Sequence, residues 1–485
     1  MITKSQLKLL WKGSKPVYKN TYIFEVDESR YALDFRNIFF CRLDENMENA
    51  LESQLSDEQT SLSAPLTTDV LSALTRSGYF LSQHSDSHVP RFSYDTMNFS
   101  FAPIHDCNFA CKYCYADGGK STVDYKLYFD EKKIDKLLDY IYADKYANYQ
   151  NYKFDFVSGG EPLLDFPILE YFLKSLRNMD AIHNKASTVL IVTNGTLLTS
   201  QIIERLDNYD VFLGISIDGA EYVHNRNRVY ISGDGTYNDV VKGISLLRES
   251  NASSKLKDAW AMVVITPYTD NLVDVMETCI NLGFKRMQMQ LIRESREHPV
   301  SFKTSDIASL KESYTSLFSF ILKHAKKGDF SRLKMIANDN DSFGKFFGRL
   351  LLRRPVYYRC FAGKNKVAIT AGGEIYPCDS FCGNQDFVFG SIDSKEENPD
   401  IVDLFQQAHV QNRLRCSKCW ARLICGGDCF YNSFLVNGNI MDPDPITCEM
   451  NRFFIEQAIH MLISLKVTDP GSITYLAKFF NLQYL

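Results

Sequence analysis

The sequence predicts an α/β protein built on a parallel sheet that curves into a partial or complete six-stranded barrel. From about residue 97, apolar strand-like runs alternate with amphipathic helical segments, which is the pattern of repeated β-α-β units. Polar and cysteine-containing motifs follow the first four of these strands. The chemistry of parallel barrels lies at the carboxyl ends of their strands, so we expect these motifs to form one site.

Six strands and five helices are predicted in this region. The expected strands cover residues 97–103, 152–159, 187–195, 211–219, 258–266 and 286–292. The expected helices cover residues 130–145, 165–179, 199–206, 236–250 and 270–283. The barrel domain is therefore expected over residues 95–302, followed by a mostly helical bridge over residues 303–357.

The chain on either side of the barrel has a different pattern. Residues 1–90 predict a small α+β domain, with strands at 21–26 and 30–35, a helix at 67–81 and a linker at 82–90. Residues 358–485 contain eight of the thirteen cysteines and are expected to form a separate cysteine-rich domain.

The composition is that of an ordinary soluble globular protein. Apolar residues make up 45% of the chain and charged residues 23%. The net charge of −5 gives no basic surface for nucleic acid. No apolar run approaches the roughly 18–20 residues of a membrane helix, and the N-terminus lacks the apolar core of a signal peptide. We therefore expect a cytoplasmic protein that binds neither nucleic acid nor a membrane.

A compact cysteine motif follows the first barrel strand. In the string HDCNFACKYCYADGG, Cys107, Cys111 and Cys114 have the spacing C-x3-C-x2-C. Disulfides are disfavoured in the cytosol, so clustered cysteines there indicate metal binding or catalysis. Three thiolates can hold three corners of a 4Fe–4S cluster and leave the fourth iron open. A zinc site closed by His105 is the alternative.

The next motif makes this segment similar to a known family. Gly159, Gly160 and Glu161 belong to the string SGGEP, which follows the second predicted strand. Together with the cysteine triplet, it resembles the GGEP motif of the radical S-adenosylmethionine (radical SAM) enzymes. In that family the open iron binds S-adenosylmethionine, the glycines allow close backbone approach, and the motif receives the ligand's ammonium group.

The resemblance also implies roles for residues near the other strand ends. Tyr113 is expected near the adenine, and Asn194, Ser216 and Asp218 near the ribose and carboxylate. From their residue types alone, the last three could equally be turn or cap residues. Arg228 is a candidate partner for the ligand's carboxylate, or a solvated arginine. The cofactor would supply a 5′-deoxyadenosyl radical, and the protein would position the target carbon and exclude water.

The C-terminal cysteines resemble the SPASM extension of radical SAM enzymes, which holds auxiliary 4Fe–4S clusters. The resemblance implies one cluster on Cys416, Cys419, Cys425 and Cys448, and another on Cys360, Cys378 and Cys429. The family's further cysteine, about six positions after the first, is absent from the string GKNKV. The second cluster would therefore have an open iron or use Cys382. A zinc ribbon is the alternative for the whole region.

The likeness predicts a radical SAM peptide maturase that installs a thioether or carbon–carbon crosslink. Asp379 is then a candidate base, or a turn residue beside the cluster. The expected partners are a ribosomal precursor peptide and an external electron donor of flavodoxin or ferredoxin type. The N-terminal region has the layout of a winged, leader-peptide recognition domain, in which the peptide adds a strand to a sheet edge. The alternatives are an anaerobic sulfatase-maturing enzyme, which makes formylglycine, and a zinc-stabilised binding protein without catalysis.

Overall fold

The computed structural model describes residues 21–26, 29–47, 77, 89, 94–101, 104–116, 129–157, 159–394 and 398–482. The helix predicted at 67–81 and the linker predicted at 82–90 lie outside these residues except at Ser77 and Val89. Within the described ranges, no helix combines the length and the apolar character needed to span a membrane.

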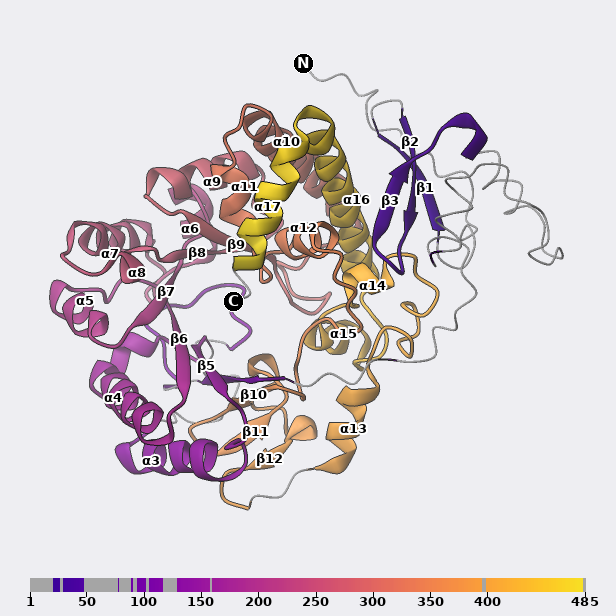
Figure 1. Cartoon of the computed structure of the whole chain (residues 1–485). Coiled ribbons are helices and arrows are strands. Elements are labelled where there is room, and N and C mark those ends of the chain that lie inside the picture. Colours follow the sequence, from indigo (N-terminus) through magenta and orange to yellow (C-terminus); the bar gives the residue numbers. More distant parts are fainter. Residues whose placement is uncertain are drawn as a thin grey trace.

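A nine-stranded sheet runs through the molecule in the order β12-β11-β10-β4-β5-β6-β7-β8-β9 (Figure 1). Strands β4 to β9 are parallel and lie in chain order, as the sequence predicts. They are β4 (Thr96–Phe101), β5 (Asn151–Phe156), β6 (Ala186–Thr193), β7 (Val211–Ser216), β8 (Trp260–Ile265) and β9 (Arg286–Leu291). The other neighbour of β4 is β10 and not β9, so the sheet is open and forms a partial barrel.

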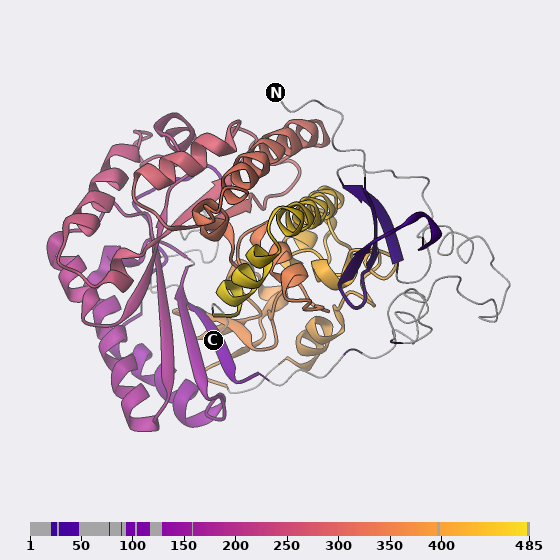
Figure 2. The same cartoon turned by 45° about the horizontal axis from the view of Figure 1, so that its top comes forward.

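Helices from the β-α-β units cover the outer face of this curved sheet, and the C-terminal region lies on the opposite side (Figure 2). The outer helices are α3 (Glu131–Asp139), α4 (Phe166–His183), α5 (Ser200–Asp207), α6 (Glu221–Asn227), α7 (Tyr237–Glu249), α8 (Ser254–Lys257) and α9 (Leu272–Asn281). Side-chain caps define where several of them begin: Asp130, Asp165, Thr199 and Asn271 each accept a hydrogen bond from a backbone N–H in the first turn. Each such cap contributes about 1 kcal/mol.

Aromatic side chains hold the outer helices on the sheet. The rings of Phe99 and Phe154 on neighbouring strands lie 5.4 Å apart, and those of Phe101 and Phe154 lie 5.7 Å apart. From α4, Phe172 packs edge-on against Phe156 at 5.1 Å. All five side chains are buried. Burying each contributes roughly 1.5–3 kcal/mol, so this layer fixes the sheet that carries the motifs.

The C-terminal region adds three strands to the same sheet, which the sequence analysis did not anticipate. They are β10 (Lys366–Ile369), β11 (Glu374–Tyr376) and β12 (Gly390–Ser391). Strand β10 runs parallel to β4, with Ala368 opposite Ser100, and β11 and β12 continue antiparallel. The cysteine-rich segment is therefore joined by backbone hydrogen bonds to the strand that precedes Cys107.

Helices account for most of the rest of the C-terminal half. The bridge segment forms α10 (Ile307–Ala325), α11 (Ser331–Ile336) and α12 (Gly344–Leu351), in agreement with its expected helical character. Beyond it lie α13 (Pro399–Gln407), α14 (Arg422–Cys425), α15 (Phe430–Asn437), α16 (Pro445–Thr468) and α17 (Pro470–Leu482).

A separate antiparallel sheet precedes the barrel. The two predicted strands are present as β1 (Thr21–Val26) and β2 (Ser29–Asp34), and a third strand, β3 (Phe39–Arg42), was not predicted. This sheet lies beside the C-terminal region in both views (Figures 1 and 2). Tyr22 of β1 stacks on Trp420, with ring centroids 4.6 Å apart and planes 3° apart. The N-terminal sheet thus contacts the loop between Cys419 and Cys425.

Candidate active site

The loop after β4 gathers the first three cysteines. Its backbone is held by hydrogen bonds from Ala110 N–H to the Val229 carbonyl at 2.8 Å and from Lys112 N–H to the Asn227 carbonyl at 2.9 Å. Burial raises the pKa values of Cys107 and Cys111 to about 12, and the charge of Cys114 adds to this effect at both thiols. The three thiols therefore lie near one another.

The two glycines of the next motif let its chain approach this loop closely. A Cβ atom on Gly160 would lie 2.0 Å from the carbonyl oxygen of Asp106, which no side chain can tolerate. The backbone at Gly159 has φ +86°, a left-handed conformation that glycine adopts readily. The Glu161 N–H donates to the same Asp106 carbonyl at 2.9 Å. The structure therefore agrees with the close backbone approach that the motif implies.

The side chain of Glu161 is occupied by protein contacts. One carboxylate oxygen accepts from the Thr193 hydroxyl at 2.6 Å and from the Leu163 N–H at 3.0 Å. The other accepts from the Asn194 N–H at 2.7 Å. Burial raises the pKa of Glu161 to about 7, against these hydrogen bonds, which lower it. In this structure Glu161 ties the end of β5 to the end of β6, and its contact with the ligand's ammonium stays a prediction.

Asn194 also links neighbouring loops. Its amide donates to Asn108 at 2.8 Å, between the first two cysteines, and its carbonyl oxygen accepts from the backbone and hydroxyl of Thr196. This is the turn geometry that the residue type favours. Ser216, the last residue of β7, is half-buried, and its hydroxyl has no hydrogen-bond partner among the described residues. Ser216 is therefore better placed than Asn194 to contact a ligand, because its hydroxyl is not already used.

Asp218 and Tyr113 meet in a buried polar cluster. The Tyr113 hydroxyl donates to Asp218 at 2.5 Å, and Arg228 Nε lies 3.2 Å from the same carboxylate oxygen. The other oxygen accepts from the Val264 N–H at 3.0 Å. Arg228 is only 7% exposed, so the expectation of a solvated arginine is wrong. Its partner here is the protein's own carboxylate, and the cofactor roles of Asp218 and Tyr113 stay predictions.

Asp379 lies between the first cysteine loop and the C-terminal cysteines. Lys366 Nζ is 3.1 Å from its carboxylate, and the hydroxyls of Ser100 and Tyr115 donate to it at 3.4 and 3.5 Å. Burial alone would raise the pKa of Asp379, but the charge and hydrogen bond of Lys366, together with the charge of Arg293, hold this pKa below its ordinary range. The pairing of β10 with β4 therefore brings an ionised carboxylate next to Tyr115, which follows Cys114 directly.

Four C-terminal cysteines line one cavity of about 120 Å³: Cys416, Cys419, Cys425 and Cys448. These are the four that the resemblance assigns to one auxiliary cluster. Asn451 donates to the Cys425 sulfur at 3.5 Å, and Arg415, Arg422 and Arg452 also line the cavity. Amide and guanidinium donors around sulfur ligands suit an anionic cluster with four thiolates.

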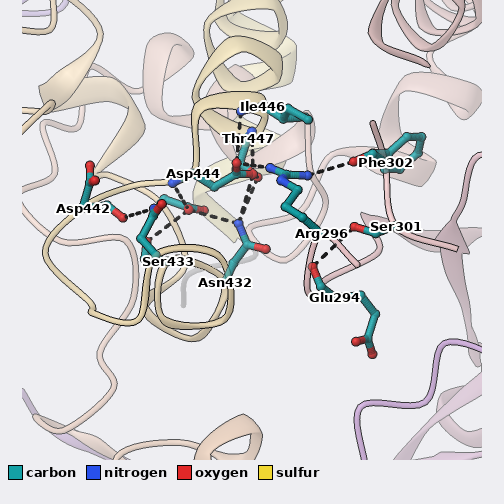
Figure 3. Close-up of polar contacts among 12 residues, drawn as sticks. Glu294, Arg296, Ser301, Phe302, Asn432, Ser433, Asp442, Asp444, Ile446 and Thr447 are labelled. Atoms are coloured by element: carbon teal, nitrogen blue, oxygen red, sulfur yellow. Dashed lines mark hydrogen bonds and ion pairs between the residues drawn. The ribbon is translucent and has the colours of Figure 1, made fainter. Parts of the chain in front are cut away.

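The start of helix α16 fixes one of these ligands. Asp444 caps the helix by accepting from the N–H groups of Ile446 and Thr447 at 3.2 and 3.0 Å. Arg296 pairs with the same carboxylate and donates to the Phe302 carbonyl at 2.9 Å, as Figure 3 shows. The loop after β9 is thereby tied to the first turn of α16, which carries Cys448.

The remaining C-terminal cysteines form a second group. Burial raises the pKa of Cys378, and the charges of Cys429 and Cys360 add to this effect. Cys382 lies close by, with its thiol 4.0 Å from the Cys378 carbonyl. The structure therefore gathers the three cysteines assigned to the second cluster, with Cys382 beside them.

These groups fit iron–sulfur clusters better than single zinc ions. Zinc sulfur ligands lie about 2.3 Å from one shared ion. In the part of the chain that the structure describes, no three His, Cys, Asp or Glu side chains converge closely enough to hold one ion. In an iron–sulfur cluster each thiolate binds a different iron, so the sulfur atoms lie farther apart than they do around one zinc ion. The cavity lined by Cys416, Cys419, Cys425 and Cys448 allows such a separation. His105, the candidate fourth zinc ligand, is buried and kept neutral by a pKa that burial lowers to about 4, but among the described residues it does not converge on one point with the cysteines.

Three residues at the site were missed by the sequence analysis. Tyr115 could have been found, because it follows Cys114 directly. Lys366 follows no recognisable motif, and it reaches Asp379 only through the pairing of β10 with β4. Arg293 follows the sixth strand, where a polar side chain was a reasonable candidate, and it contacts the Cys429 sulfur at 3.8 Å.

Comparison with known proteins agrees with this geometry. The radical SAM superfamily matches residues 102–285. An uncharacterized protein of Methanocaldococcus jannaschii is 30% identical over 40% of this chain and 62% of its own length, so this chain spans less than two thirds of that relative. The radical SAM cyclopropyl synthase TigE of Paramaledivibacter caminithermalis is 23% identical, over 73% of this chain and 72% of its own.

The cysteine-type anaerobic sulfatase-maturating enzyme of Clostridium novyi is 24% identical, over 74% of this chain and 93% of its own. The solved structure of anSMEcpe with bound AdoMet superposes with a TM-score of 0.61 at 19% identity, over 77% of this chain and 99% of that one. The superposition shows a shared fold, and the family match covers the cysteine loop and the strand-end motifs. Residues 102–285 are thus a radical SAM domain, and over a longer stretch the chain is distantly similar to the anaerobic sulfatase-maturating enzymes and to TigE.

Proposed function

We propose that the chain is a radical SAM peptide maturase that crosslinks a ribosomal precursor peptide through a thioether or carbon–carbon bond. A 4Fe–4S cluster on Cys107, Cys111 and Cys114 would supply the electron that cleaves S-adenosylmethionine to methionine and a 5′-deoxyadenosyl radical. The observation that carries the proposal is the ionised Asp379, held by Lys366 between that cysteine loop and the second group of cysteines.

The arrangement suits oxidation of a peptide by two hydrogens. One leaves as a hydrogen atom to the deoxyadenosyl radical, and the other leaves as a proton and an electron. We assign the proton to Asp379, and this assignment is supported by its carboxylate lying within hydrogen-bond distance of Tyr115 beside Cys114. The C-terminal cysteines would hold two SPASM-type auxiliary clusters, which would supply the route by which the electron reaches an external flavodoxin or ferredoxin.

The N-terminal sheet supports a peptide substrate that carries a leader. The superposition covers 99% of anSMEcpe but only 77% of this chain, so this chain has a part that anSMEcpe lacks. The strands β1 to β3 are candidates for that part. As a recognition domain, the sheet would take an extended leader peptide at an open edge, where backbone hydrogen bonds give affinity. The curated relative TigE bears the name of a cyclopropyl synthase, which favours carbon–carbon bond formation as one outcome.

Formylglycine formation on a sulfatase is the second candidate. It is favoured by the aspartate directly after Cys378 and by the 93% coverage of the Clostridium novyi sulfatase-maturating enzyme. A binding protein without catalysis is not proposed, since residues 102–285 match the radical SAM superfamily.

Mass spectrometry separates the two candidates. The full-length enzyme is reconstituted without oxygen, reduced, and incubated with S-adenosylmethionine and the peptide encoded by a short reading frame beside its gene. Crosslinking predicts a loss of two hydrogens per deoxyadenosine, missing fragment ions between the joined residues, and no reaction with a hydrazide. A hydrazide-reactive aldehyde would instead support formylglycine formation.

Iron analysis tests the cluster assignment separately. Three 4Fe–4S clusters require about twelve irons per chain. A value of about eight would refute the presence of two auxiliary clusters.

A further inference from the structure

Arg293 extends from the end of the barrel sheet to the second group of C-terminal cysteines. It lies in the loop after β9, and its Nη1 atom is 3.8 Å from the Cys429 sulfur. Its Nη2 atom donates to the side-chain oxygen of Gln290 at 2.6 Å. The Gln290 amide in turn donates to the Asn340 carbonyl at 3.3 Å. The guanidinium is therefore held in one orientation, with its Nη1 edge directed at a cluster ligand.

The charge of Arg293 has no carboxylate partner of its own. Among the described residues, no Asp or Glu oxygen lies within ion-pair distance of the guanidinium. The carboxylate with the largest electrostatic effect on it is that of Asp379, which is already paired with Lys366. A half-buried arginine without a carboxylate partner needs another negative group. The Cys429 thiolate, as a ligand of an anionic cluster, would provide it.

We propose that Arg293 is a positioning residue that donates a hydrogen bond to the Cys429 thiolate and raises the reduction potential of the cluster on Cys360, Cys378 and Cys429. This inference rests on the proposed function, because it requires that auxiliary cluster. Reduction adds one negative charge to the group that the thiolates hold. A cation near the ligand sulfur stabilises the reduced form more than the oxidised form, and hydrogen bonds to sulfur are known determinants of cluster potential.

The inferred effect has a place in the reaction. Crosslinking leaves a peptide radical after the hydrogen atom has gone to the deoxyadenosyl radical. Completing the bond releases one proton and one electron. Arg293 lies near both the proposed proton acceptor, Asp379, and the proposed electron acceptor, the cluster held by Cys429, since the charges of both residues act on its guanidinium. By favouring the reduced cluster, Arg293 would make it a better acceptor for that electron.

A redox titration of the full-length, anaerobically reconstituted enzyme tests the proposal. Electron paramagnetic resonance follows each reduced cluster, and the signal that disappears in Cys360→Ala identifies the cluster of interest. In Arg293→Gln we expect the equilibrium constant for its reduction to fall about tenfold, which is about 59 mV for one electron. Arg293→Lys keeps a positive charge and should recover most of this loss.

The controls separate a local effect from a general loss of charge. The cluster on Cys416, Cys419, Cys425 and Cys448 should keep its potential in Arg293→Gln. Arg415→Gln removes an arginine that lines that other cavity and pairs with Asp442. It should leave the potential of the cluster beside Arg293 unchanged.

The outcomes are distinguishable. An unchanged potential in Arg293→Gln at full iron content overturns the inference and leaves the proposed function intact. A wild-type enzyme without the cluster on Cys360, Cys378 and Cys429 overturns both. If Arg293→Gln loses that cluster, the variant Gln290→Leu is titrated in its place, because it removes a hydrogen-bond partner of Arg293. Loosening the guanidinium should then lower the potential by a smaller amount, and no shift overturns the inference.

Discussion

Gly160 offers a direct test of how the cysteine loop is held, because its surroundings leave no room for a side chain. The Cβ of an alanine would lie 2.0 Å from the Asp106 carbonyl oxygen and 2.7 Å from the Asp106 carbonyl carbon and amide nitrogen. Real Cβ contacts are not found below 3.0 Å, so the segments around Gly160 and Asp106 must move apart by about 1 Å. Gly160 does not have a positive φ, so the effect of Gly160→Ala is steric alone.

This movement acts on the residue that precedes Cys107. Overpacking of this kind costs about 1–3 kcal/mol, and a displacement of about 1 Å at a reacting centre can lower a rate about 100-fold. We expect Gly160→Ala to fold and bind iron, but to form deoxyadenosine from S-adenosylmethionine and dithionite about 100-fold more slowly. The assay measures deoxyadenosine by chromatography, together with iron content.

Gly328→Ala is the matched control. It adds the same methyl group at a glycine with φ +84° that has nothing within 4 Å of the added carbon. It should retain full deoxyadenosine formation at a cost of about 1 kcal/mol in stability. If Gly160→Ala forms deoxyadenosine as fast as Gly328→Ala, the close approach does not position the cysteine loop and the reasoning fails.

Three further predictions concern carboxylates. Asp379→Asn should lower peptide turnover at least about 100-fold while deoxyadenosine still forms, since a general base contributes roughly that much; intact turnover refutes the assignment. Burial raises the pKa of Glu456 from 4.5 to about 7. Its folded-state pKa lies above the unfolded value, so the side chain destabilises the protein increasingly between those two pH values. Glu456→Gln should therefore raise the free energy of unfolding by about 1–3 kcal/mol at pH 8 and by much less at pH 5, measured as the shift of the thermal midpoint. An equal gain in stability at both pH values contradicts this. Asp218→Asn leaves Arg228 buried without a counter-charge and should cost about 3–5 kcal/mol. Adding Arg228→Met should recover much of that loss in thermal unfolding, and no recovery would show that the pair does not carry the effect.

The parallel strands and their motifs could be predicted because the signals are local. An apolar run followed by a helix of the right length defines each β-α-β unit, and the polar motifs follow directly. All six predicted strands are present, in chain order and parallel. The cysteine loop and Gly160 meet because parallel strands place their carboxyl ends at one edge.

The contribution of the C-terminal region to the sheet could not be predicted in the same way. Strand β10 has four residues, too few to show a periodicity, and its partner β4 lies about 270 positions earlier in the chain. The position of Asp379 beside Tyr115 follows from this long-range pairing. Sequence reasoning could assign Asp379 a role by resemblance, but it could not identify Lys366 as its counter-charge.

The polar residues at the ends of β6 and β7 illustrate a different limit. Asn194 and Asp218 have residue types that suit a ligand, a turn or an ion pair equally well, and only the fold selects among these. In the structure Asp218 accepts from Tyr113 and pairs with Arg228, whose guanidinium lies 5.2 Å from the Tyr113 ring centre. The aromatic ring expected near the adenine is therefore oriented by the fourth-strand motif. A carboxylate at a strand end can therefore serve a cofactor site indirectly, by fixing the residue that is expected to touch the ligand. In that arrangement, changing Asp218 should disturb the packing of Tyr113 before it removes any direct contact with the ligand.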